Sequence, residues 1–281
     1  MSSFEKIEMG DKLFGKAHNV HPKTWKHALP QWSVGRQLGA SEEEKAEKQA
    51  FLTLIGGEGD VVREDGEGEV VKSAEALTEV LFIIDKSGSM CGKEEAIVEG
   101  FNQAIAEQRE VPGKVLISTV FFNHEMKCVH QRIPLAEVPL MTAEDYETSG
   151  CTALLDSVGK SVDHVFNAQK AEDASLRPSQ TLVMIMTDGH ENASMLYSNK
   201  EVKQMIATLQ ERYGWTFFYF GANVDHFAEA SALGINHDLA ESFEADRRGV
   251  SCCMKRCSVR IHERRRAANL GALKSRAKRK Q

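Results

Sequence analysis

The chain has 281 residues, of which 42% are hydrophobic and 27% are charged, and its formal net charge is −6. This composition excludes a low-complexity or fibrous chain and allows one substantial hydrophobic core. The charge is uneven, because residues 246–281 contain thirteen Lys and Arg against two acidic residues. The first 245 residues therefore carry the acidic excess, and the two parts are interpreted separately.

The first fifteen residues are polar and lack an apolar signal core, and the longest apolar runs, such as residues 80–84, are too short to cross a bilayer. Six cysteines are scattered along the chain without a secretory signal, so free thiols are expected. These features predict a cytoplasmic protein.

Residues 1–77 are interpreted as an N-terminal extension that ends in an acidic, Gly- and Glu-rich linker over residues 56–69. Within it, Ser41 with Glu44 three positions later forms a capping-box pattern and predicts a helix that ends near Leu54. We expect this extension to pack loosely or to be disordered.

From residue 78 to residue 245 apolar strand patterns alternate with helical patterns, which predicts a parallel sheet with crossover helices. A further strand at 125–132 is expected to form an antiparallel hairpin with the strand before it. The predicted fold is α/β and doubly wound, with a mostly parallel sheet of about six strands, one antiparallel edge strand and helices on both faces. The four main strands are expected at residues 80–84, 114–122, 181–186 and 216–220.

Three polar loops follow predicted strands or precede a predicted helix. The first strand ends in Asp85, Ser87 and Ser89 within five residues, Thr152 opens a helix, and the third main strand ends in Thr187 and Asp188. Open parallel sheets bind ligands at the carboxyl edge of their strands, where these loops are expected. Two carboxylates and several hydroxyl groups suit a hard octahedral cation such as Mg²⁺.

The spaced motif D-x-S-x-S at 85–89, the later Thr152 and the T-D-G at 187–189 resemble the metal-ion-dependent adhesion site of von Willebrand factor A domains. The resemblance covers about residues 79–243, and the runs 148–156, 188–194 and 214–223 extend it toward stand-alone bacterial members. It implies hydroxyl ligands from Ser87, Ser89 and Thr152, and carboxylates from Asp85 and Asp188 that bind directly or through water. It also implies Mg²⁺, or Mn²⁺ or Ca²⁺, and an Asp or Glu donated by a partner protein. We therefore expect a binding module and not an enzyme.

Other chemistries are weighed against this interpretation. A metal-dependent hydrolase using the same ion would need a general base, for which Glu191 and His190 are the candidates. A phosphate-binding loop would need Ser or Thr where Glu94 stands, and a haloacid dehalogenase-type phosphatase would need Asp where Ser87 stands. Neither of these two motifs is complete.

Several Cys and His residues could carry chemistry of their own. Cys151 at a helix start could be a reactive thiolate, although a packing role is the simpler interpretation. His190 is expected to contact solvent or a partner. Cys252, Cys253 and Cys257 with His262 could be drawn as a zinc site, but their spacing matches no standard zinc motif.

The basic tail, residues 246–281, has three interpretations. It could bind nucleic acid through its Lys and Arg residues, with salt-dependent affinity. It could be a solvated, disordered tail. As a third hypothesis, the tail could be translated out of frame, because a shifted reading of residues 250–256 gives a sequence like the last helix of the family.

Overall fold

Six strands form one mixed sheet in the order β3-β2-β1-β4-β5-β6, and the computed structural model describes residues 41–56, 76–222 and 225–278. The interpretation of residues 1–40 and of the linker over 57–75 lies outside the described residues. The strands are β1 (Leu77–Asp85), β2 (Lys114–Phe122), β3 (Met126–Pro134), β4 (Gln180–Thr187), β5 (Thr216–Gly221) and β6 (Ala240–Ser242).

The pairing of the strands confirms the predicted topology. β1 pairs in parallel with β2 and with β4, β4 pairs in parallel with β5, and β5 pairs in parallel with β6. β3 is the antiparallel edge strand and pairs with β2. Because the parallel strands run in one direction, the loops after β1 and β4 leave the sheet at the same edge.

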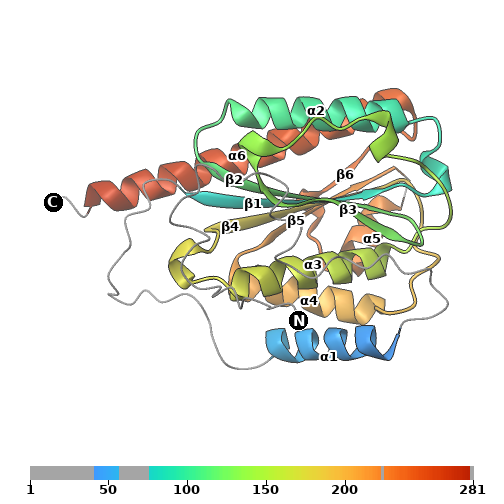
Figure 1. Cartoon of the computed structure of the whole chain (residues 1–281), viewed down its shortest axis with the longest axis horizontal. Helices are drawn as coiled ribbons and strands as arrows, with labels where there is room; N and C mark the ends of the chain where they lie inside the picture. Colours follow the sequence, from blue (N-terminus) through green and yellow to red (C-terminus); the bar gives the residue numbers. More distant parts are fainter. Residues whose placement is uncertain (1–40, 57–75, 223–224, 279–281) are drawn as a thin grey trace, which may run out of the picture. The chain divides into compact units, whose positions relative to one another are not determined.

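Helices cover both faces of the sheet, as predicted (Figure 1). Helix α2 (Glu94–Arg109) and helix α6 (Arg247–Lys278) lie on one face, and α3 (Leu154–Lys170) and α4 (Asn199–Tyr213) lie on the other. The short helix α5 (His226–Ala232) follows β5. Each of α2, α3 and α4 buries apolar residues at helical spacing, among them Phe101 of α2, Val162 of α3 and Ile206 of α4.

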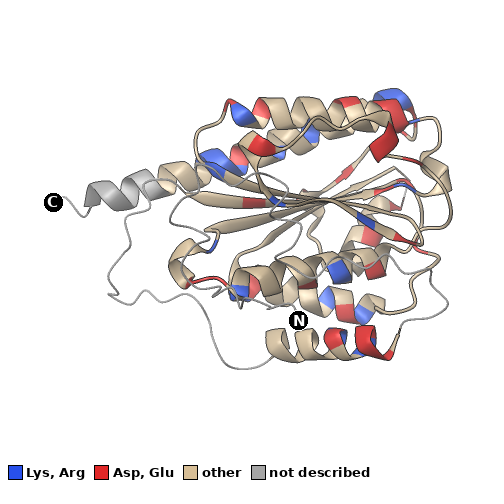
Figure 2. Ribbon diagram, in the orientation of Figure 1, with Lys and Arg blue, Asp and Glu red and all other residues tan. Residues whose placement is uncertain are grey.

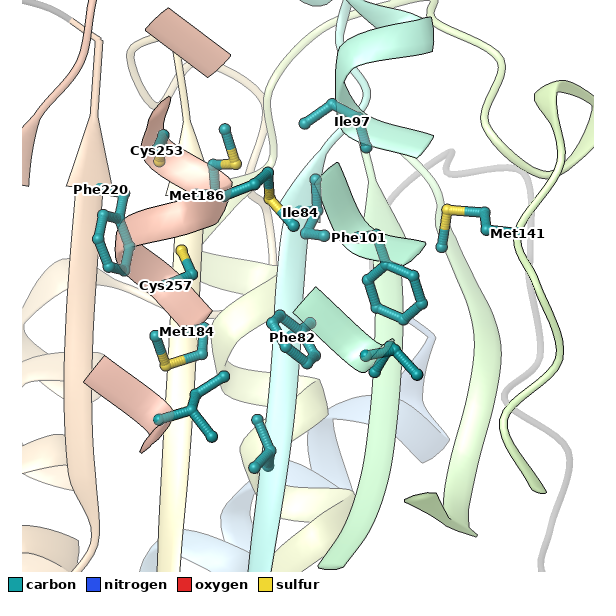
Figure 3. Packing of buried hydrophobic residues seen from close by; sticks show 14 of the residues in the cluster. Phe82, Ile84, Ile97, Phe101, Met141, Met184, Met186, Phe220, Cys253 and Cys257 are labelled. Carbon is teal, nitrogen blue, oxygen red and sulfur yellow. The ribbon is translucent and has the colours of Figure 1, made fainter. Parts of the chain in front are cut away.

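The main hydrophobic core lies between the sheet and the layer of α2 and α6. Figure 3 shows Phe82 and Ile84 of β1 beside Phe101 of α2, with sulfur-containing side chains of β4 and α6 next to them. Phe82 and Phe101 meet edge to face with ring centroids 5.4 Å apart. This core fixes β1 at the centre of the sheet and so fixes the loop that follows it.

The prediction that residues 246–281 are disordered is wrong for the described part of the tail, which forms helix α6. Its buried residues Val250, Met254, Cys257 and Ile261 recur at helical spacing and pack into the core. Arg265 is also buried and donates hydrogen bonds to the backbone carbonyls of α2 and the following turn. The reading-frame hypothesis concerns the gene and stays a prediction.

Helix α1 (Glu42–Gly56) is more firmly packed than expected. The predicted capping box at Ser41 and Glu44 is present, and the acidic first turn is visible in Figure 2. Phe51 is buried and meets Phe166 of α3 edge to face, with ring centroids 5.7 Å apart. No helix among the described residues combines the length and the apolar character needed to cross a bilayer.

Candidate metal centre

Asp85, the last residue of β1, has both carboxylate oxygens engaged by the chain. Its Oδ1 accepts a hydrogen bond from the backbone N–H of Ser87 at 2.7 Å, and its Oδ2 accepts one from Thr187 Oγ1 at 2.6 Å. Burial raises the pKa of Asp85 to about 6, while the hydrogen bonds from Thr187 and Ser87 act in the opposite direction. The ends of β1 and β4 are thereby joined at one carboxylate.

The two serines of the first loop connect Asp85 to Asp188 in the loop after β4. Ser87 Oγ lies 3.0 Å from Ser89 Oγ, and Ser89 Oγ donates a hydrogen bond to Asp188 Oδ1. Ser87 is buried and Ser89 is an exposed residue. Residues that are a hundred positions apart in the sequence thus form one polar cluster.

Thr152 reaches the same cluster from the loop before α3. Its backbone N–H donates to Asn192 Oδ1 at 2.9 Å, and its carbonyl accepts from the N–H groups of Asn192 and Ala193. A methyl group placed on Gly189 would lie 2.9 Å from Thr152 Oγ1, 3.3 Å from Ser89 Oγ and 3.7 Å from Asp85 Oδ2. Three of the predicted ligands therefore surround a single point beside Gly189.

A second layer of hydrogen bonds supports the loop before α3. Tyr146 Oη donates to the backbone carbonyl of Asp85, and Asn123 Nδ2 donates to the carbonyl of Ser149 at 2.7 Å. Gly150 has a positive φ of 72°, and a Cβ there would collide with the His124 ring. These contacts keep the loop of Thr152 close to the end of β1.

Two carboxylates organise the loop after Asp188. Asp156, which is 1% exposed, accepts hydrogen bonds from the backbone N–H groups of residues 195–197. Glu191 accepts hydrogen bonds from three backbone N–H groups, those of Leu155, Ala193 and Ser194. The Glu191 carboxylate is therefore engaged by the backbone, which weakens its candidacy as the general base of a hydrolase.

His190, the other candidate base, is paired with α5. Its Nδ1 lies 2.6 Å from Glu229 Oε1 on α5, and its side chain is 67% exposed. This exposure is consistent with the expected contact with solvent or a partner.

Sequence reasoning missed Lys93, although it touches the centre of the cluster. Its ammonium group lies 2.7 Å from Asp188 Oδ2 and also donates to the backbone carbonyl of Ser89. Both side chains of this ion pair are largely buried, with 9% exposure for Lys93 and 2% for Asp188. No spacing motif identifies such a residue, because the turn at Gly92, where φ is 83°, brings it back toward the loop.

The structure brings Asp85, Ser87, Ser89, Thr152 and Asp188 together, and their chemistry fits a divalent cation. All five offer oxygen atoms, and those of Thr152, Ser89 and Asp85 lie within 4 Å of the point that a Cβ on Gly189 would occupy. The described residues contain no group of three or more His, Cys, Asp or Glu side chains that could hold a metal ion. A site with two carboxylates and three hydroxyl groups is instead suited to a hard cation such as Mg²⁺, which keeps some of its waters.

The other clusters considered from the sequence do not form. On α6, Cys252 is exposed while Cys253 and Cys257 are buried, so the three thiols do not share one face. Cys151 is exposed beside Thr152. A zinc site at these cysteines is not supported.

No protein-family model and no curated protein matches the sequence. Among solved structures, the chain is similar to a von Willebrand factor type A structure from Catenulispora acidiphila, with 15% identity and a TM-score of 0.45 over 66% of this chain and 42% of that one. It is also similar to proximal thread matrix protein 1 from the mussel byssus with a zinc-occupied MIDAS motif, with 12% identity and a TM-score of 0.46 over 68% and 47% of the two chains. A third is the manganese-loaded TRAP protein of Plasmodium vivax, with 15% identity and a TM-score of 0.44 over 64% and 72%.

The similar region spans less than half the length of the first two of these proteins. The fold assignment rests on the strand order and the parallel crossovers of this chain. With its antiparallel edge strand and helices on both faces, the chain has an α/β fold like that of von Willebrand factor A domains.

Proposed function

We propose that the protein binds a divalent cation, with Mg²⁺ as the expected ion, at Asp85, Ser87, Ser89, Thr152 and Asp188. The observation that supports this most is the cradle beside Gly189, where oxygen atoms of Asp85 and Ser89 from the loop after β1 and of Thr152 from the loop before α3 lie within 4 Å of one point in the loop after β4. Hydroxyl ligands without charge leave such an ion electrophilic. The ion would then accept one further oxygen ligand from outside the chain.

We further propose that this outside ligand is the carboxylate of an Asp or Glu of a partner protein. Of the five residues, Ser89 is the exposed one, so a partner can approach the cluster from its side. Glu191 is engaged by backbone groups, so a binding role fits the structure better than hydrolysis. The protein would act as an interaction module whose contact is switched by the cation.

Thermal unfolding with and without Mg²⁺ tests the cation site. A ligand that binds only the folded state raises the melting temperature, so Mg²⁺ in excess over chelator should stabilise the protein. Ser87→Ala should remove this stabilisation because it deletes a buried ligand. Ser231→Ala, an exposed serine on α5, is the matched control and should keep it.

If Mg²⁺ and Mn²⁺ both leave the melting temperature unchanged, the cation site is refuted. The partner carboxylate is tested separately by capturing partners with the full chain in Mg²⁺ and in chelator. Binding that survives chelation and the Ser87→Ala change would contradict the proposed contact.

A further inference from the structure

Lys93 occupies a position that local helix chemistry does not favour. It is the N-cap residue of α2, and its side chain makes no capping hydrogen bond. N-caps favour Ser, Thr, Asp and Asn, and the positive end of the helix dipole repels a cation. The placement of Lys93 therefore calls for a role outside the helix.

The two carboxylate oxygens of Asp188 have different partners, and Lys93 is the partner of one of them. Oδ2 is 2.7 Å from the Lys93 ammonium, while Oδ1 accepts a hydrogen bond from Ser89 Oγ, which belongs to the proposed cation site. The same ammonium donates a hydrogen bond to the carbonyl of Ser89, so Lys93 connects the loop after β1 to the loop after β4. Asp188 is thereby oriented with one oxygen toward the cation cradle and the other toward Lys93.

We propose that Lys93 is a built-in counter-charge that weakens, without abolishing, cation binding by the isolated protein, so that the partner's carboxylate raises the affinity of the site for the ion. This inference rests on the proposed function. In this arrangement Lys93 is a positioning residue for Asp188, and its charge sets the affinity of the site.

The charges at the site give the physical reason. Asp85 and Asp188 together with Lys93 leave a formal charge of −1, which a divalent cation converts to +1. A largely buried ammonium in contact with one of the proposed ligands opposes the binding of the ion, because the local dielectric constant is low. The residual positive charge in turn attracts one more carboxylate. Without Lys93, the loaded site would be neutral and would hold its ion more tightly in the absence of a partner.

Titration with Mn²⁺, followed by the loss of the electron paramagnetic resonance signal of the free ion, measures the affinity directly. The full-length chain is compared with Lys93→Met, which keeps the aliphatic stem but removes the charge, and with Lys93→Arg, which keeps the charge. We expect Lys93→Met to bind Mn²⁺ about tenfold more tightly or better, and Lys93→Arg to remain close to the unaltered chain.

Thermal unfolding adds a readout that a merely structural role would not produce. In chelator, Lys93→Met should melt below the unaltered chain, because Asp188 is left buried without its partner. In saturating Mn²⁺ this deficit should become smaller, because the variant binds the ion more tightly and gains more stability from it. A structural role for Lys93 would lower both melting temperatures alike.

The outcomes separate the two proposals. Mn²⁺ binding by the unaltered chain with equal or weaker binding by Lys93→Met would overturn the role of Lys93 and leave the cation site standing. Absence of Mn²⁺ binding in all three proteins, with the same difference in melting temperature in chelator and in Mn²⁺, would overturn both.

Discussion

The carboxylate of Asp156 shows how single buried residues hold the candidate site together. It lies on α3 and accepts hydrogen bonds from the backbone N–H groups of Met195, Leu196 and Tyr197. Hydrogen bonds to a charged acceptor are stronger than those between neutral groups, and buried N–H groups without a partner are costly. Asp156 therefore anchors the far part of the loop that begins with Asp188.

Replacing Asp156 by Ala should destabilise the protein by about 2–4 kcal/mol, because buried N–H groups lose their acceptor. Chemical denaturation of the variant and of Asp173→Ala, an exposed acid beyond the end of α3, measures the difference. The stabilisation by Mg²⁺ should also become smaller. A loss of unfolding free energy no larger than that of Asp173→Ala would show that the loop does not depend on Asp156.

Asp163 on α3 makes the stability depend on pH. Burial raises its pKa to about 7, and the nearby Glu47 of α1 acts in the same direction. Because the folded-state pKa lies above the unfolded value, the folded state binds the proton more tightly. Its contribution is favourable below about pH 4 and is lost as the pH rises toward 7.

Asp163→Asn should therefore stabilise the protein by about 1 kcal/mol at pH 8 and have little effect at pH 4. The free energies of unfolding of the variant and of Asp238→Asn, an exposed control, are compared at both pH values. An equal effect of Asp163→Asn at pH 4 and pH 8 would argue against a raised pKa.

At the residue scale, the residues proposed as cation ligands could be named from the sequence because they follow strands in short, recognisable patterns. Asp85, Ser87 and Ser89 lie within five residues, and parallel strands bring the ends of β1 and β4 to one edge. The residues that support them could not be predicted in the same way. Lys93, Asp156 and Asn192 act through contacts across loops, which depend on the three-dimensional course of the chain.

At the scale of elements, the strands of the sheet were predicted because their apolar runs are dense and continuous, as buried parallel strands require. Helix α6 was not predicted, because its many Arg and Lys residues suggested a solvated tail. Its buried apolar residues, which include Val250, Cys257 and Ile261, are few beside its many basic residues. Several of its basic residues pair within the chain, as Arg260 does with Glu241.

Ile261→Ala tests whether α6 packs on the sheet. Ile261 is 1% exposed, so its truncation should cost about 2–4 kcal/mol. Val259→Ala, two residues earlier on the same helix and 53% exposed, is the matched control and should cost less than about 0.5 kcal/mol. Equal and small effects in chemical denaturation would indicate that α6 does not pack here.

Over the whole molecule, the strand order explains why one end of the sheet carries the polar cluster. β1 is flanked by β2 and β4, so the loops that follow β1 and β4 meet, and the loop before α3 closes over them. The core beneath them is packed by α2 and α6 on one face and by α3 and α4 on the other. The fold thus presents a small oxygen-lined cradle on a rigid base, and the proposed function depends on a single ion that these loops share.

Anomalous diffraction from crystals of the full chain grown with Mn²⁺ is the most direct measurement of that shared ion. A peak is expected beside Gly189, in contact with the hydroxyl groups of Ser87 and Ser89 and within reach of Thr152, Asp85 and Asp188. A Mn²⁺ peak found only elsewhere on the protein, with Ser89 still hydrogen-bonded to Asp188 across the cradle, would contradict the cation site.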